Sequence, residues 1–170
     1  MHVTFHINGQ TVPALVMQDK DYVGGKLVEV TRDYFAQSDF GTVYYLGEDV
    51  DDYTNGVITG HEGAWRFGVN TNHLGIIVPG RPKVGQKFAA ENVPGITSEN
   101  DEITSLTAAI KTPIGTFFNA MKITESYPDG HKEFKYYIPT IGVVTEIDPD
   151  GTVSLISHES AWQLRAPGIK

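Results

Sequence analysis

Carboxylates are concentrated in the stretch GTVYYLGEDVDDYTNG, residues 41–56. Side chains alternate between the two faces of a strand, so a strand over 42–48 predicts that Glu48 lies on the same face as Tyr44. Glu48 ends an apolar strand, and a carboxyl group held in such a place can act as a general acid or base. Glu48 is therefore a candidate catalytic residue.

The three aspartates that follow Glu48 have a different expected place. They fall beyond the strand over 42–48, in the turn that leads to Asn55 and Gly56, where acidic side chains are usually solvated. Their spacing does not fit an EF-hand loop, which needs acids at alternate positions and a distal glutamate. We expect these side chains to be exposed: Asp49, Asp51 and Asp52.

A second candidate carboxylate, Glu62, lies close to Trp65 in the segment HEGAW, residues 61–65. Beside an indole in an apolar pocket, a carboxyl group would have a raised pKa, which suits a general acid or base. The alternative is structural, with Trp65 as a core anchor and Glu62 as a paired acid. We expect at least one of Glu48 and Glu62 to face the interior, and we expect Trp65 and Tyr44 to be buried.

An inward carboxylate needs a partner, because an unpaired buried charge is costly. Arg32, Lys122, Lys135 and the tyrosine hydroxyls are the candidates. Lys135 and Tyr137 share one strand face, where they could orient a polar ligand; the alternative is a set of ion pairs on the outside, which contribute little to stability. The candidate ligand-binding residues are Tyr44, Trp65, Arg32, Lys122, Lys135 and Tyr137.

The composition excludes several classes of function. The chain of 170 residues has a formal net charge of −8 and a pI near 5.1, which argues against nucleic acid because phosphates need a basic surface. It contains no cysteine, which excludes thiolate catalysis, disulfides and Cys-ligated zinc. No apolar run is long enough to span a membrane. We expect no cofactor and no dedicated metal site, and a small molecule is the expected partner.

Turn signals separate short alternations of apolar and polar residues through the first half of the chain. The strands expected from them cover residues 2–7, 10–17, 26–37 and 42–48, and the segment 55–65 continues the meander. The turns between them are Asn8–Gly9, DYVGGK (21–26) and SDFG (38–41). Pro13 restricts the second strand to a sheet edge or a bulge. Residues 68–88 are rich in Gly, Asn and Pro, which predicts a long connection with short strands.

The second half is predicted to continue in strands. The segment ENDEITSLTAAIK (99–111) fits a helix or a strand. Ser98, three residues before Asp101, imitates a helix capping box, but the Thr and Ile content of the segment favours a strand, and we expect a strand. Further strands are expected over 116–127, 131–147 and 152–162. Two hairpin turns are expected at PDG (128–130) and DPDG (148–151), because glycine supplies positive φ at low cost.

These patterns predict an all-β fold. Successive strands form an antiparallel meander that closes into a barrel or curls into a half-barrel, lipocalin-like in general architecture. The length fits a single β-barrel-like domain over 1–170. Because Met1 enters almost directly into a strand pattern, we also expect an upstream segment in the native chain.

Four motifs resemble those of a known family. They are G-x-V-[WY]-Y-x-G-E at 41–48, E-G-[SA]-W at 62–65, P-x-G-T-F at 113–117 and K-Y-Y-x-P-x-[IV]-G at 135–142. The chain resembles uncharacterised bacterial proteins that are often secreted or lipid-anchored, and the resemblance covers most of its length. It implies a β-rich extracytoplasmic domain, periplasmic or secreted.

Three functions are compatible with this fold, because fold alone does not choose a function. The first is binding of an apolar or amphipathic small molecule in a barrel mouth lined with aromatic side chains. The second is a small barrel enzyme of the isomerase, cyclase or lyase type, with Glu48 or Glu62 as general acid or base. The third is a structural or interaction module. An apolar cavity would favour the first, a cavity with paired acids and a base would favour the second, and a filled interior would favour the third.

Overall fold

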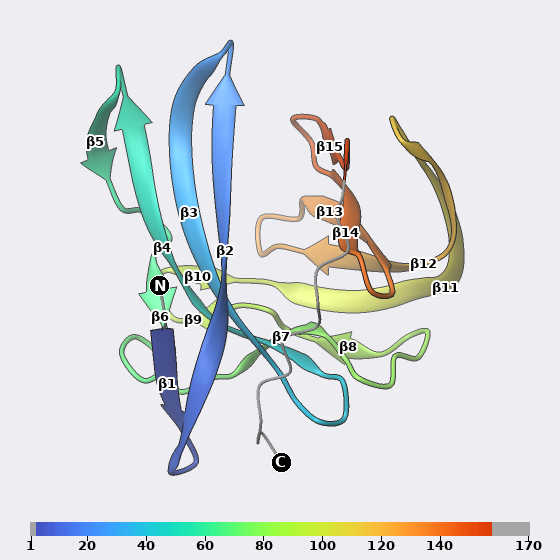
Figure 1. Ribbon diagram of the computed structural model, residues 1–170, viewed down its shortest axis with the longest axis horizontal. Coiled ribbons are helices and arrows are strands. Elements are labelled where there is room, and N and C mark those ends of the chain that lie inside the picture. The colour runs from blue at the N-terminus through green and yellow to red at the C-terminus, as the bar shows by residue number, and fades with distance from the viewer. Residues whose placement is uncertain (1–2, 158–170) are drawn as a thin grey trace. The chain divides into compact units, whose positions relative to one another are not determined.

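The computed structural model describes residues 3–157, which form strands joined by turns and contain no helix (Figure 1). Every ladder between these strands is antiparallel, and the meander is curled into a half-barrel with open edges, which confirms the predicted fold class. In the described part of the chain, no helix long and apolar enough to cross a membrane occurs.

The described residues group into two compact units, and each unit is considered by itself below. Unit 1 comprises residues 3–81 and 90–98, and unit 2 comprises residues 82–89 and 99–157. The expectation of a single domain over 1–170 stays a prediction.

Unit 1 is built on a seven-stranded sheet with the order β1-β2-β3-β4-β5, in which β6 and β7 also pair with β4. Its strands are β1 (Val3–Ile7), β2 (Gln10–Val23), β3 (Lys26–Gln37), β4 (Val43–Thr54), β5 (Val57–Gly60), β6 (Trp65–Arg66) and β7 (Gly75–Val78). A separate two-stranded ladder joins β9 (Asn92–Val93) and β10 (Thr97–Ser98). The short strands β5, β6 and β7 therefore meet β4 at successive points along its length.

The predicted turns at 8–9 and 38–41 are confirmed, whereas the turn predicted over 21–26 is confined to residues 24–25 because β2 continues to Val23. Asn8 adopts a φ of 51° before Gly9, so β1 and β2 pair directly across this turn. The 24–25 and 38–41 turns join β2 to β3 and β3 to β4. Pro13 lies where β2 pairs with β1 only, so its missing N–H interrupts no central ladder.

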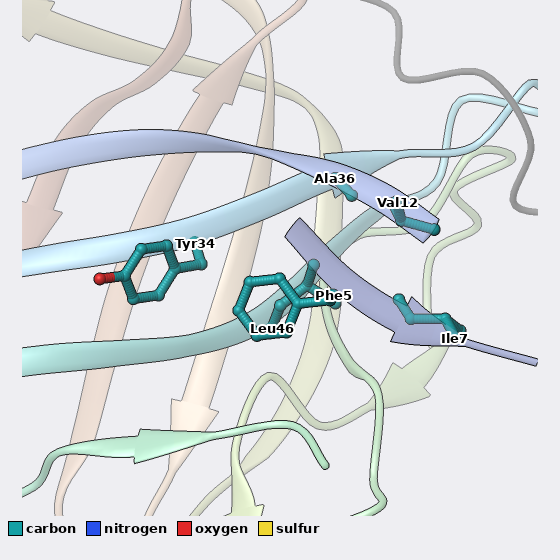
Figure 2. Close-up of a cluster of buried hydrophobic side chains, with 6 residues drawn as sticks. All are labelled: Phe5, Ile7, Val12, Tyr34, Ala36 and Leu46. Atoms are coloured by element: carbon teal, nitrogen blue, oxygen red, sulfur yellow. The ribbon is translucent and has the colours of Figure 1, made fainter. Parts of the chain in front are cut away.

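Each face of the unit 1 sheet has its own apolar cluster. One cluster contains Phe5, Ile7, Val12, Tyr34, Ala36 and Leu46, and Tyr44 packs against it. Figure 2 shows Tyr34 at its border, with the hydroxyl directed away from Phe5 and Leu46. The second cluster contains Tyr45, Trp65, Ala90 and Val93, with Phe35 packed against it. Alternation along β3 and β4 separates these two clusters.

A bulge at Gly47 changes which face the end of β4 presents. The register passes from Asp33↔Glu48 to Phe35↔Tyr45, so β4 contains one residue more than β3 there. Gly47 has a φ of 125°, and a Cβ at this position would lie 2.2 Å from the carbonyl oxygen of Trp65. The bulge places Glu48 on the face of Tyr45 and not on that of Tyr44, so the predicted shared face of Glu48 and Tyr44 is wrong.

Unit 2 is a six-stranded sheet with the order β15-β14-β13-β12-β11-β8. Its strands are β8 (Lys87–Phe88), β11 (Asn100–Thr112), β12 (Gly115–Ser126), β13 (Lys132–Ile138), β14 (Gly142–Ile147) and β15 (Thr152–Ser154). The expected strand over 99–111 is confirmed as β11, and its buried residue Ile103 pairs with the buried Ile123 of β12.

Both predicted hairpin tips of unit 2 are confirmed, since β12 pairs with β13 across 128–130 and β14 pairs with β15 across 148–151. The single strand predicted over 131–147 is wrong. A further turn separates β13 from β14, with φ at 70° for Thr140 and 104° for Gly142. Of the strand expected over 152–162, residues 158–162 lie outside the described residues.

Candidate functional site

The candidate site of unit 1 is a pair of carboxyl groups, Glu48 on β4 and Glu91 just before β9. Both residues are half-buried, and their side chains hydrogen-bond to each other. Such a bond requires a proton on one of the two groups. Both oxygens of Glu91 already accept hydrogen bonds, from Trp65 Nε1 at 3.0 Å and from Thr97 Oγ1 at 2.6 Å. The proton of the pair therefore belongs on Glu48.

Close backbone packing brings Glu91 to this position. Gly75 on β7 has no side chain, and a Cβ there would lie 2.0 Å from the carbonyl oxygen of Ala90. Ala90 and Val93 are buried in the second apolar cluster, one on each side of Glu91 in the chain. Glu91 is thus held between two anchors on a segment that cannot retreat from β7 without exposing them.

Asp33 and Tyr45 complete the polar part of the site. Asp33 is buried and lies opposite Glu48 in the ladder between β3 and β4. The hydroxyl of Tyr45 donates a hydrogen bond of 2.6 Å to Asp33 Oδ1. The ring of Tyr45 stacks on Phe35 with centroids 5.1 Å apart and meets Trp65 edge-on at 5.2 Å. Aromatic side chains therefore fix the groups that surround the carboxyl pair.

Glu48 is electrostatically unusual, with a pKa raised from 4.5 to about 8. Burial is the largest cause, followed by the charge of Glu91 and the hydrogen bond to it, and then by the charge of Asp33. A hydrogen bond with Tyr45 acts in the opposite direction but does not cancel these effects. Burial and the neighbouring carboxylates therefore favour the protonated form of Glu48 at pH 7.

The described ion pairs of unit 1 lie on the opposite face of the same strands. Arg66 Nε donates to Asp49 Oδ1 at 2.9 Å, and the guanidinium carbon lies 4.6 Å from the centre of the Tyr34 ring. Tyr34 OH also donates to Asp49 Oδ2, at 2.7 Å. The Arg66 hydrogen bond is the main reason that the pKa of Asp49 is lowered. This network provides a positive charge to Asp49, whereas no ion pair among residues 3–157 includes Glu48.

Asp51 is held in a similar way on that face. Arg32 Nη2 donates to Asp51 Oδ2 at 2.8 Å, and His61 Nδ1 lies 3.1 Å from Asp51 Oδ1. The expectation that Asp49, Asp51 and Asp52 are exposed in a turn is wrong, because β4 continues to Thr54 and all three are half-buried. Basic partners and backbone donors allow these acids to lie within a strand. The alternation of apolar and polar residues along the sequence does not predict such partners.

Glu62 does not have the surroundings predicted for it. Residues 61–63 form an exposed turn and not a strand, and Glu62 donates its backbone N–H to Asp52 Oδ2 at 3.1 Å. The expected apolar pocket beside Trp65 is therefore wrong for Glu62. Trp65 itself is buried, as predicted, whereas Tyr44 is half-buried. Of the two candidate catalytic carboxylates, Glu48 faces the interior.

Unit 2 contains a separate polar cluster around Lys135 and Glu125. Lys135 Nζ lies 3.1 Å from Glu125 Oε2, and the Glu125 side chain is only 4% exposed. Tyr127 OH donates to the same oxygen at 3.4 Å. Burial raises the pKa of Glu125, and the attraction of Lys135 acts against that rise. Lys135 and Tyr137 interact electrostatically, consistent with the predicted shared face.

Two further buried acids lie beside this ion pair. One oxygen each of Glu99, Asp101 and Glu125 lies within 4.8 Å of the others, and Asp101 is the ladder partner of Glu125. All three residues are buried. Carboxylate oxygens are the ligands that Ca²⁺ and Mg²⁺ prefer, so this trio could hold such an ion, although Lys135 already supplies one positive charge.

The three basic candidates have other described contacts. Arg32 is engaged with Asp51, and Lys122 of unit 2 lies with its Nζ 4.2 Å from the ring centre of Phe134. Lys135 is engaged with Glu125. A tyrosine hydroxyl, that of Tyr45, is the predicted type of partner whose hydrogen bond with Glu48 is seen, and pairing of Glu48 with a base stays a prediction.

Sequence reasoning missed Asp33, Glu91, Glu99 and Asp101 as site residues. A weak signal existed for Glu99 and Asp101, which alternate along a strand start and so share a face. No local signal identified Glu91, because it lies outside any regular strand pattern and meets Glu48 only through folding.

In comparisons with known proteins, no family model, no curated protein and no solved structure matches this chain. The resemblance of its motifs to uncharacterised secreted bacterial proteins stays a prediction, as does the extracytoplasmic location that it implies.

Proposed function

We propose that unit 1 performs proton transfer on a small molecule, with Glu48 as the general acid or base. The observation that carries this proposal is the hydrogen-bonded pair of Glu48 and Glu91 on a sheet face whose neighbouring charged group, Asp33, is also acidic. Two carboxyl groups that share one proton divide into a donor and an acceptor, which is how one site supplies an acid and a base near neutral pH.

The energetic cost of this arrangement supports a functional origin. An acid that must stay protonated at pH 7 lowers the stability of the folded state, because the unfolded chain would ionise it. A structural carboxylate avoids this cost by pairing with a base, as Asp49 and Asp51 do with Arg66 and Arg32 on the other face. Carboxyl groups with strongly perturbed pKa values are concentrated at catalytic sites.

The partial exposure of the carboxyl pair also fits a catalytic role better than a purely structural one. Glu48 and Glu91 are half-buried and so keep some contact with solvent, whereas Trp65 and Tyr45 are buried. The reaction class that matches is removal of a proton from carbon and its return, as in isomerases and lyases. Binding of an apolar ligand and a purely structural role stay alternative predictions, and the polar character of this site favours neither.

A carbon acid with a coloured product tests the proposal. In nitrobenzisoxazole, a base removes the ring C–H proton, the C–H electron pair forms the nitrile, and the N–O bond breaks to release a nitrophenolate. We expect the full chain to accelerate this ring opening, with a rate that rises through pH 8 as Glu48 ionises and then levels.

The matched variants are Glu48→Gln and Glu102→Gln. Glu102 is a strand glutamate with a 42% exposed side chain that pairs with Lys87 in unit 2. Glu48→Gln should remove the rise near pH 8 and reduce the acceleration by at least about 100-fold, the usual contribution of a positioned base. Equal losses in both variants, or a profile without a rise near pH 8, would refute the proposal.

A further inference from the structure

The second half of β2 is an open sheet edge. β1 pairs with β2 only from Gln10 to Ala14, whereas β3 pairs with β2 from Leu15 to Val23. Figure 1 shows β2 and β3 continuing well past the end of β1. No strand among the described residues covers the other side of β2 over 15–23. The Lys20 N–H donates to Asp19 Oδ1 at 2.7 Å, and the other backbone groups that point away from β3 there are available to pair with another chain.

This edge differs from a protected one in its apolar content. Native edges are usually short or blocked by lysine and proline, and this one is long and carries exposed apolar side chains at both ends. Leu15 is 53% exposed, Met17 43%, Tyr22 59% and Val23 69%. Exposed apolar groups that flank an open edge are typical of a strand-addition site.

The centre of the edge is acidic on one face. In the ladder with β3, Asp19 lies opposite Thr31 and Asp21 lies opposite Glu29, so the three acids gather on one side of the sheet. No described ion pair includes Asp19, Asp21 or Glu29. Burial and then the charges of Asp19 and Glu29 raise the pKa of Asp21. A strand added here would meet a negative potential on that face.

We propose that the edge of β2 over Leu15–Val23 binds an extended peptide segment as an added antiparallel strand, with basic side chains opposite Asp19 and Asp21. Its apolar side chains would then lie opposite Met17 and Leu15, on the same face. Read from its own N-terminus, such a segment has the pattern basic-x-basic-x-apolar-x-apolar. This binding is independent of the proton transfer proposed for Glu48.

Charge complementarity selects this occupant over a second copy of the chain. A two-fold antiparallel pairing of the edge with itself, centred on Asp19, places the two copies of Asp19 opposite each other. A pairing centred on Lys20 places Lys20 of one copy opposite Lys20 of the other, and Asp19 opposite Asp21. Centred on Gln18, it places Met17 opposite Asp19. Like charges directly opposite across strands are destabilising, and a basic segment avoids every one of these conflicts.

The test uses the full chain and a fluorescent peptide, acetyl-TKTKTVTVT-amide. Two further peptides carry backbone N-methyl groups, one on every threonine except the first and the other on the lysines and valines. Both keep the charge of the parent, but alternate nitrogens of a strand point to opposite sides, so only one of the two presents its methyl groups to β2. We expect one methylated peptide to lose binding and the other to retain it.

Two chain variants test the charge contribution. Asp19→Asn with Asp21→Asn should weaken binding about threefold to tenfold, as two exposed ion pairs would, whereas Asp39→Asn, in an exposed turn of unit 1, should leave it unchanged. Amide exchange should slow over 15–23 when the peptide is added. Equal binding of both methylated peptides, protection elsewhere in the chain, no binding, or concentration-dependent self-association through 15–23 would overturn the proposal.

Discussion

Replacing Glu48 by glutamine should stabilise the protein, and the gain should depend on pH. Glutamine has nearly the shape of a protonated glutamate and can still donate a hydrogen bond to Glu91. It cannot ionise. The substitution therefore removes the cost of keeping Glu48 neutral while preserving its packing and its contact with Glu91.

The magnitude follows from the pKa of Glu48, which is raised from 4.5 in a free glutamate to about 8 in the folded chain. The folded state binds this proton more tightly than the unfolded state, so the stability due to it is complete below pH 4.5 and is lost as the pH rises toward 8. At about 1.4 kcal/mol for each pKa unit, the loss is about 3 kcal/mol at pH 7 and about 4–5 kcal/mol above pH 8. The glutamine variant does not lose this stability.

Denaturant unfolding of the wild type and of Glu48→Gln, at intervals from pH 4.5 to 9, measures the difference directly. We expect a gap near zero at the acidic end, which widens through neutral pH and is constant above pH 8. Other titrating groups cancel in the comparison because both chains contain them. Glu102→Gln, which lacks a carboxyl neighbour of this kind, should give a gap that varies little with pH.

A gap that does not change with pH would refute the assignment of the proton to Glu48. A glutamine variant less stable than the wild type at pH 8 would show that Glu48 is ionised and paired with a positive charge, contrary to the contacts seen. In either case the proposed acid–base role would lose its physical basis.

Two other substitutions test the buried ion pair of unit 2 and the β4 bulge of unit 1. Lys135→Met should cost about 3–5 kcal/mol in urea unfolding at pH 7, because it leaves Glu125 buried beside other acids without its cation; adding Glu125→Gln should recover most of the loss, and no recovery would contradict an electrostatic cause. Gly47→Ala should cost more than about 2 kcal/mol, because its Cβ would meet the Trp65 carbonyl and its φ is positive. Gly151→Ala, where a Cβ meets nothing, should change the melting temperature little.

Local patterns were sufficient for the strands and their turns. Alternation along the chain and the Asn-Gly and Asp-Gly pairs predicted the 8–9, 55–56, 128–130 and 148–151 turns, because these depend on the φ preferences of a few adjacent residues. The same patterns indicated an antiparallel meander, because short turns can join only antiparallel neighbours.

Strand ends were predicted less well where charged residues occupy a strand. Asp49, Asp51 and Asp52 read as turn residues because acids disfavour strands on average. All three lie within β4, where Arg66 and Arg32 on neighbouring strands neutralise Asp49 and Asp51. Those partners are distant in sequence, so no window around residue 50 contains the information.

The sequence by itself determined that this protein is an antiparallel β fold with an acidic surface, and it singled out Glu48. Only the tertiary structure decided what Glu48 is. A bulge at Gly47 turned its side chain to the other face, and the close approach of β7 and residue 90 brought Glu91 to it. The pKa of a carboxyl group depends on the charges and solvent within a few ångströms, and folding assembles those from β3, β4, β6 and the segment before β9.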